Sequence, residues 1–140
     1  MQFLYHVSCK GSPARLYQLA DGTFQIMEDG EITPLMVGFE YVLIDSAFAE
    51  YIEELELVGV HIADATIYDP RRKEEIRSYK QLKIDQRFSS GMIRDLDLEG
   101  ERFLLMDDTY LFVSPDLRRR LESSPFRYLQ FTEGLSEFAV

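Results

Sequence analysis

The sequence is poor in the residues that mark several common classes of protein. It has one cysteine, Cys9, which cannot form an internal disulfide and so agrees with a reducing compartment. No apolar run reaches the roughly 18 residues that a membrane-spanning helix needs. The opening residues, MQFLYHVSCK, lack the basic, apolar and small-residue segments of a signal peptide. We therefore expect a cytoplasmic protein that does not associate with a membrane.

Basic residues are also scarce. The chain has 15 Lys and Arg against 25 Asp and Glu, which gives a net charge of −10 and a pI near 4.6. Such a surface repels phosphate backbones, so nucleic acid is not expected as a partner. Two explanations stay open: the acidity serves solubility alone, or it attracts a basic protein.

Motifs for catalysis are missing as well. There is no GxSxG, no glycine-rich phosphate loop, no CxxC and no HExxH. The only histidines, His6 and His61, are each followed three residues later by a possible partner, Cys9 and Asp64. On a strand, residues three apart point to opposite faces. We therefore expect no metal, no cofactor and no enzymatic activity, although a small hydrolase with a histidine-and-carboxylate pocket remains an alternative.

What the chain does contain is ample core material, with 46% hydrophobic residues, ten Phe and eight Tyr. Its second half includes an unambiguous strand-helix-strand pattern. Residues 110–113, YLFV, read as a buried strand, and Ser114, Pro115 and Asp116 each favour a helix start. Ser123-Ser124-Pro125 ends the helix, because proline disfavours helical backbone at the preceding residue. A strand that includes Phe131 then follows.

The same pattern occurs earlier, beginning at Tyr41. The helix cap and the apolar positions recur at the same spacing, in the pairs Ile44 and Val113, Asp45 and Ser114, Phe48 and Leu117, Ile52 and Leu121, and Ile62 and Phe131. A helix is predicted over residues 46–56. Chance could produce such a match, because strand-helix-strand patterns are common. The alternative is a duplicated unit, in which each copy is too small to bury its apolar face alone.

Together these patterns predict one α+β domain over residues 1–140, mainly an antiparallel sheet with two short helices. Residues 1–38 read as an antiparallel meander, 39–68 as the first strand-helix-strand unit, 69–108 as connecting strands and 109–140 as the second unit. Within the connecting region, strands are predicted over residues 79–84, 92–99 and 102–106.

Two groups of carboxylates are the candidate partner-binding residues. In the predicted strand over 92–99 and the turn after it, acids recur at every second residue and would share one face. Such a row could bind calcium or a basic protein, or could be a solvated face. The second group covers the outer side of the first helix. The candidates are Asp95, Asp97, Glu99 and Glu101 in the row and Glu50, Glu53 and Glu54 on the helix. Glu56 belongs to the same helix cluster, for which a solvated face is the simplest interpretation.

A resemblance to a known family rests on the two repeated units. The segment YLFVSPDL (110–117), followed by Leu121 and Phe131, resembles the C-terminal signature of immunity family 11, a bacterial family also called domain of unknown function 1629 and typified by a myxobacterial protein. The earlier segment VLID (42–45), through Ile52, looks like the first copy, with Asp45 in place of the usual serine. The matching positions are helix caps and core, so no functional residue follows from them.

The resemblance implies a cytoplasmic immunity protein that binds and occludes a cognate bacterial toxin. An acidic surface would suit a basic toxin through complementary potential and fast association. The alternative is a structural or adaptor protein of a secretion or envelope machine.

Overall fold

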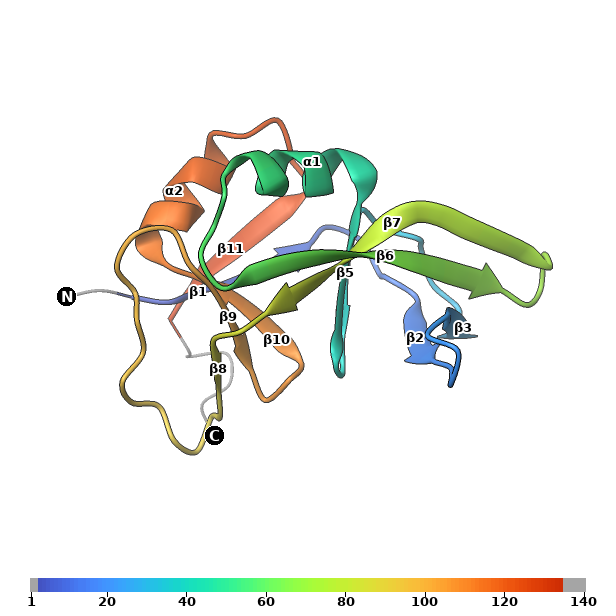
Figure 1. Ribbon diagram of the computed structural model, residues 1–140, viewed down its shortest axis with the longest axis horizontal. Helices are drawn as coiled ribbons and strands as arrows, with labels where there is room; N and C mark the ends of the chain where they lie inside the picture. The colour runs from blue at the N-terminus through green and yellow to red at the C-terminus, as the bar shows by residue number, and fades with distance from the viewer. Residues whose placement is uncertain (1–2, 135–140) are drawn as a thin grey trace.

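Two sheets and two short helices make up the part of the chain that the computed structural model describes, residues 3–134 (Figure 1). One sheet has the strand order β11-β1-β10-β9-β8 and the other has the order β2-β3-β6-β7-β5-β4. Most neighbouring strands are antiparallel, as predicted. The elements are β1 (Tyr5–Cys9), β2 (Arg15–Gln18), β3 (Phe24–Glu28), β4 (Leu35–Gly38), β5 (Tyr41–Asp45), α1 (Ser46–Glu54), β6 (Val60–Asp69), β7 (Glu74–Ile84), β8 (Arg87–Phe88), β9 (Phe103–Met106), β10 (Tyr110–Val113), α2 (Pro115–Glu122) and β11 (Leu129–Glu133).

The predicted duplication is present as two units of the same topology. In the second unit the β9–β10 hairpin leads into α2, and the chain returns as β11. β11 does not pair with β10, because β1 lies between them and is antiparallel to both. The first unit repeats this with the β4–β5 hairpin, α1 and β6, and here β7 is the intervening strand. Each unit is therefore a strand-helix-strand crossover that is split by a strand from elsewhere in the chain.

Both helices begin as the sequence predicts. The Asp45 carboxylate accepts a hydrogen bond from the Phe48 N–H at 2.9 Å, and the Ser114 hydroxyl accepts one from the Leu117 N–H at 3.4 Å. Pro115 occupies the first position of α2, where its missing N–H costs nothing. Neither helix in residues 3–134 has the length and apolarity needed to cross a membrane.

The core explains why the strands read as continuous apolar runs. Alternate residues of β5 and β10 point to opposite faces, and both faces are covered. Toward the helices, Ile44 and Val113 pack with the buried faces of α1 and α2 in one cluster that is shared by both sheets. On the far faces, Leu43 belongs to a second cluster and Phe112 to a third. The two units therefore share one central core, and each sheet has a further core of its own.

The expected N-terminal meander is wrong in its pairing. β2 and β3 form the predicted hairpin, but β1 pairs with β10 and β11 in the other sheet. β3 runs parallel to β6, and β4 pairs with β5. The local apolar pattern of a segment predicts that the segment is a strand, but it does not indicate which strands it pairs with. Residues 1–2 of that segment, and residues 135–140 of the second unit, lie outside the described residues.

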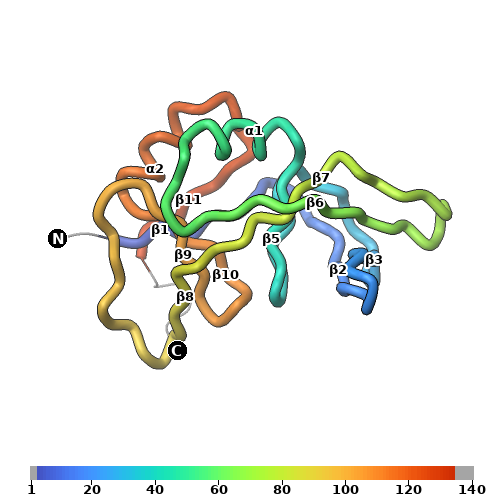
Figure 2. Tube along the Cα trace, in the orientation of Figure 1, coloured from blue at the N-terminus to red at the C-terminus, as the bar shows by residue number. Residues whose placement is uncertain are grey.

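The predicted strand over residues 92–99 is also wrong, because this segment is a loop. Gln86 takes the place of a neighbouring strand: its side-chain Oε1 accepts from the Asp97 N–H at 2.8 Å, and its Nε2 donates to the Asp97 carbonyl at 3.1 Å. Asp95 has a φ of 58°, which breaks an extended chain. β7 begins five residues before the predicted start at Tyr79, and the β6–β7 hairpin extends well beyond the helices (Figure 2).

Candidate functional site

The loop acids do not form the expected one-sided row. Asp97 makes an ion pair with Arg102 at 3.0 Å, and Glu101 makes a two-pronged contact with Arg120 on α2. The Glu101 carboxylate raises the pKa of Arg120 above its usual value through this hydrogen bond and its charge. Because arginines of this chain already occupy two of the four carboxylates, only Asp95 and Glu99 are left without an ion pair among the described residues.

The acids of α1 present the opposite arrangement. Glu50, Glu53 and Glu54 are exposed, and Glu56 follows them in the turn after the helix. Within residues 3–134 none of these four makes an ion pair. Three of them lie at the C-terminal end of the helix, where the macrodipole is negative and like charge is unfavourable. This end of the helix carries no basic residue to compensate.

A shallow hollow lies beside these acids. It has a volume of about 220 Å³, and apolar side chains of α1, the following turn and β6 form its floor. Glu53 and Glu56 stand among its lining residues, and Val58 nearby is 71% exposed. The lining residues are Ile52, Glu53, Glu56, Leu57, Val60 and Ile62. No sequence pattern indicates this hollow, because its lining combines the end of a helix with the start of a strand.

His61 and Asp64 do not come together. The His61 Nε2 lies 2.9 Å from the Asp85 carboxylate on an exposed surface, while Asp64 is paired with Lys80. That pairing, through the hydrogen bond first, holds the pKa of the Asp64 carboxyl below its usual value. Among residues 3–134, no three His, Cys, Asp or Glu side chains are grouped as metal ligands.

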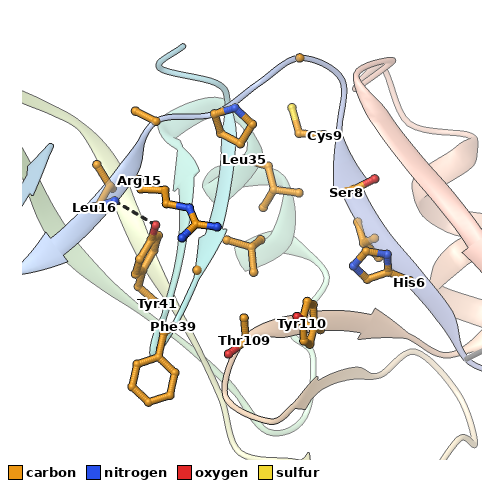
Figure 3. A pocket seen from close by; sticks show the side chains of 16 residues that line it. His6, Ser8, Cys9, Arg15, Leu16, Leu35, Phe39, Tyr41, Thr109 and Tyr110 are labelled. Atoms are coloured by element: carbon orange, nitrogen blue, oxygen red, sulfur yellow. Dashed lines mark hydrogen bonds between the residues drawn. The ribbon is translucent and has the colours of Figure 1, made fainter. Parts of the chain in front are cut away.

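His6 and Cys9 both line a cleft that lies between the two sheets and has a volume of about 610 Å³ (Figure 3). Burial raises the pKa of the Cys9 thiol, so the thiolate is disfavoured. No Asp or Glu lines the cleft. The hydrolase alternative calls for a histidine together with carboxylates, and this cleft has a different composition.

The cleft also contains residues that the sequence gave no reason to choose. Arg15 lies on β2 and Phe39 in the β4–β5 turn of the six-stranded sheet, whereas Thr109 lies in the β9–β10 turn and Tyr110 on β10 of the five-stranded sheet (Figure 3). They are far apart in the sequence, and no motif links them. Only the packing of the two units against each other brings them together.

Comparisons with known proteins found no matching family model, no matching curated protein and no matching solved structure.

Proposed function

We propose that the protein is a cytoplasmic immunity protein without enzymatic activity, which neutralises a cognate basic toxin by covering part of the toxin surface. The surface that we assign to toxin binding is the outer face of α1 and the turn after it. The observation that supports this most strongly is the group of unpaired carboxylates around the hollow next to α1. The resemblance of the repeated units to immunity family 11 supports the same function.

Electrostatics favours α1 over the loop acids as the binding surface. A partner that brings Lys or Arg to Glu101 must first displace Arg120, which already makes two contacts there. On α1 a basic side chain meets carboxylates that have no ion pair within the described chain, and it relieves their unfavourable position at the helix end. Binding at α1 therefore gains attraction without losing an existing pair.

The hollow adds a small apolar component to this surface, although polar atoms make up more of its exposed lining. Its floor suits the methylene stem of a lysine or arginine, and Glu53 and Glu56 suit the charged group at the end of that stem. Charge alone mainly accelerates association, whereas a filled apolar hollow slows dissociation. The combination is what an inhibitor that acts by occlusion needs.

The test is co-expression with the product of the neighbouring gene, followed by measurement of growth rescue and of complex formation with purified proteins. We expect rescue and a stable complex whose association slows with added salt. Absence of both rescue and a complex would refute the proposed function.

A pair of triple variants then tests the surface. The triple variant Glu50→Gln, Glu53→Gln and Glu56→Gln should weaken toxin binding by about tenfold or more. Charges at the rim of an interface mainly set the association rate, and buried charges mainly set the dissociation rate. The control removes the same number of exposed charges without an ion pair elsewhere, through Glu40→Gln, Glu74→Gln and Glu133→Gln. Equal losses in the two triple variants would show that net charge, and not α1, determines binding.

A further inference from the structure

We propose that the cleft between the two sheets is a binding site for a small organic anion that carries a carboxylate beside an aromatic ring. This inference is independent of the proposed toxin binding. The cleft exists because the two sheets do not join completely. β1 pairs with β11 along its whole length but with β10 only at Tyr5 and His6, and β4 is an edge strand.

The floor of the cleft is fixed by a contact across the six-stranded sheet. The Tyr41 hydroxyl accepts a hydrogen bond from the Leu16 N–H at 3.2 Å, which ties β5 to β2 (Figure 3). Gly38 makes this possible, because a Cβ there would lie 2.3 Å from atoms of the Tyr41 ring. The opening is held by a second contact, in which the Glu40 N–H donates to the Asp108 carbonyl at 2.7 Å. This bond joins the hairpin turns of the two units.

The charge of the cleft is unusual for this chain. Although the protein has a net charge of −10, no carboxylate lines the cleft, whereas each of four other hollows on the described residues contains at least two. Arg15 and His6 lie on opposite walls, and the Arg15 guanidinium supplies nitrogen donors (Figure 3). Thr109 also lines the cleft, and its hydroxyl already donates to the Asp107 carbonyl at 2.9 Å. A ligand carboxylate would meet Arg15 here, while the nearby acids lie outside the lining: Glu28 beside Arg15, and Glu31 beside Gly11.

Arg15 is free to accept such a ligand. Its one ion pair is with Glu28 at 3.7 Å, and the two side chains are 79% and 69% exposed. A pair of this length and exposure contributes little, so exchanging it for a two-pronged contact with a bound carboxylate is favourable.

The aromatic part of the ligand is inferred from the mouth of the cleft. Phe39 is 66% exposed and Tyr110 is 37% exposed, and they come from the hairpins of the two units. A ring between them would cover apolar surface that now faces water. The volume of about 610 Å³ falls in the range of roughly 300–1,000 Å³ typical of small-molecule sites.

The experiment uses phenylacetate as the probe, with acetate and 2-phenylethanol as matched compounds that lack the ring or the charge. Titration is followed by amide chemical shifts in two-dimensional NMR. We expect phenylacetate to shift the amides of β1, β4 and the two hairpin turns, and the other two compounds to bind several-fold more weakly. No shift of these amides by phenylacetate, or equal binding of the alcohol, would overturn the proposal.

Two arginine variants locate the charge that is responsible. Arg15→Gln should weaken phenylacetate binding about tenfold, the effect of losing one charge-assisted hydrogen bond. Arg72→Gln is the control, because Arg72 is 76% exposed and its ion pair with Asp69 is 3.9 Å long. The control should bind like the unchanged protein. Equal weakening in both variants would mean that the probe responds to overall charge and not to this cleft.

Discussion

The two repeated units share their buried residues and differ in their exposed ones. Phe48 and Ile52 of α1 are buried at the positions that Leu117 and Leu121 occupy on α2. Outside, the helices have opposite chemistry. α2 has Asp116 in its first turn and arginines in its last, the order that the macrodipole favours. α1 has the acid Asp45 as its N-cap but none in its first turn, and it ends in glutamates without a basic residue. Folding therefore constrains the inside of the unit, and the outside is available for function.

Ion pairs show the same contrast. All three arginines of α2 are paired: Arg118 with Glu122 at 2.7 Å, Arg119 with Asp116, and Arg120 with Glu101. The glutamates of α1 and its following turn have no such partners within residues 3–134. The arginines of α2 are thus held by acids of the same chain, whereas the glutamates of α1 form no ion pair among the described residues.

The largest expected effect is common to both units. Phe48→Ala and Leu117→Ala remove equivalent side chains, which are 2% and 0% exposed and belong to the shared core. We expect the free energy of unfolding to fall by about 3–5 kcal/mol for the phenylalanine and about 2–5 kcal/mol for the leucine. Urea denaturation followed by circular dichroism measures both. A loss under about 1 kcal/mol for either variant would contradict a core shared by the two helices.

Removing the helix cap should cost more stability in the second unit than in the first. Ser114 is fully buried; its hydroxyl accepts from the Arg102 N–H at 2.9 Å as well as from Leu117, and donates to the Gly100 carbonyl at 2.7 Å. Ser114→Ala leaves these buried groups unpaired and should cost about 2–4 kcal/mol. Asp45→Ala removes one half-buried cap contact and should cost about 1 kcal/mol.

The same urea curves test this difference, and a swap sharpens it. Asp45→Ser keeps a cap and should be nearly neutral. Ser114→Asp places a charge in a fully buried position and should be at least as damaging as the alanine. Equal costs for the two alanine variants would show that the additional bonds of Ser114 do not contribute to stability.

The sequence was sufficient wherever local chemistry decides the structure. Ser114, Pro115 and Asp116 each favour a helix start for a separate reason, and α2 begins there. Over residues 92–99 the alternation of acidic and apolar residues predicts an exposed strand, and this prediction is wrong. There the alternating acids belong to a loop whose backbone is paired by the side chain of Gln86. Because the partner of this backbone is a single side chain and not a strand, no periodic pattern in the sequence indicates the pairing.

Partners across long separations could not be predicted. Nothing near β1 shows that it inserts between β10 and β11, because strand pairing depends on which faces remain to be covered after the units pack. Helical spacing does predict that Glu50, Glu53 and Glu54 lie on the outer side of α1, and all three are exposed. No sequence pattern indicates the cleft, because its lining comes from segments that meet only through that long-range pairing.

High pH should destabilise the folded protein through Tyr79 and Tyr128. Burial raises the pKa of Tyr79 from its usual 10.0 to about 12, and Asp45 adds to the shift. Since the folded state holds this proton more tightly, its contribution to stability is complete below pH 10 and is lost as the pH rises toward about 12. Burial also raises the pKa of Tyr128, which packs on Phe48 of the other unit.

Unfolding free energy measured from pH 9 to 12 checks this expectation. Tyr79→Phe should reduce the steepness of the loss, and Tyr17→Phe, at a side chain that is 58% exposed, should leave the steepness unchanged. A fall of equal slope in all three proteins would show that Tyr79 does not cause the alkaline weakening.

The smallest effect tests whether α1 has given up stability for binding. Glu54→Lys places a positive charge at the C-terminal end of α1, one helical turn after Glu50, and should raise the free energy of unfolding by about 0.5–1 kcal/mol. Arg119→Glu on α2 should lower it by a similar amount, because it places a negative charge at the helix end beside Asp116. If Glu54→Lys stabilises the protein and also weakens toxin binding, the exposed charge of α1 is retained for its partner and not for the fold.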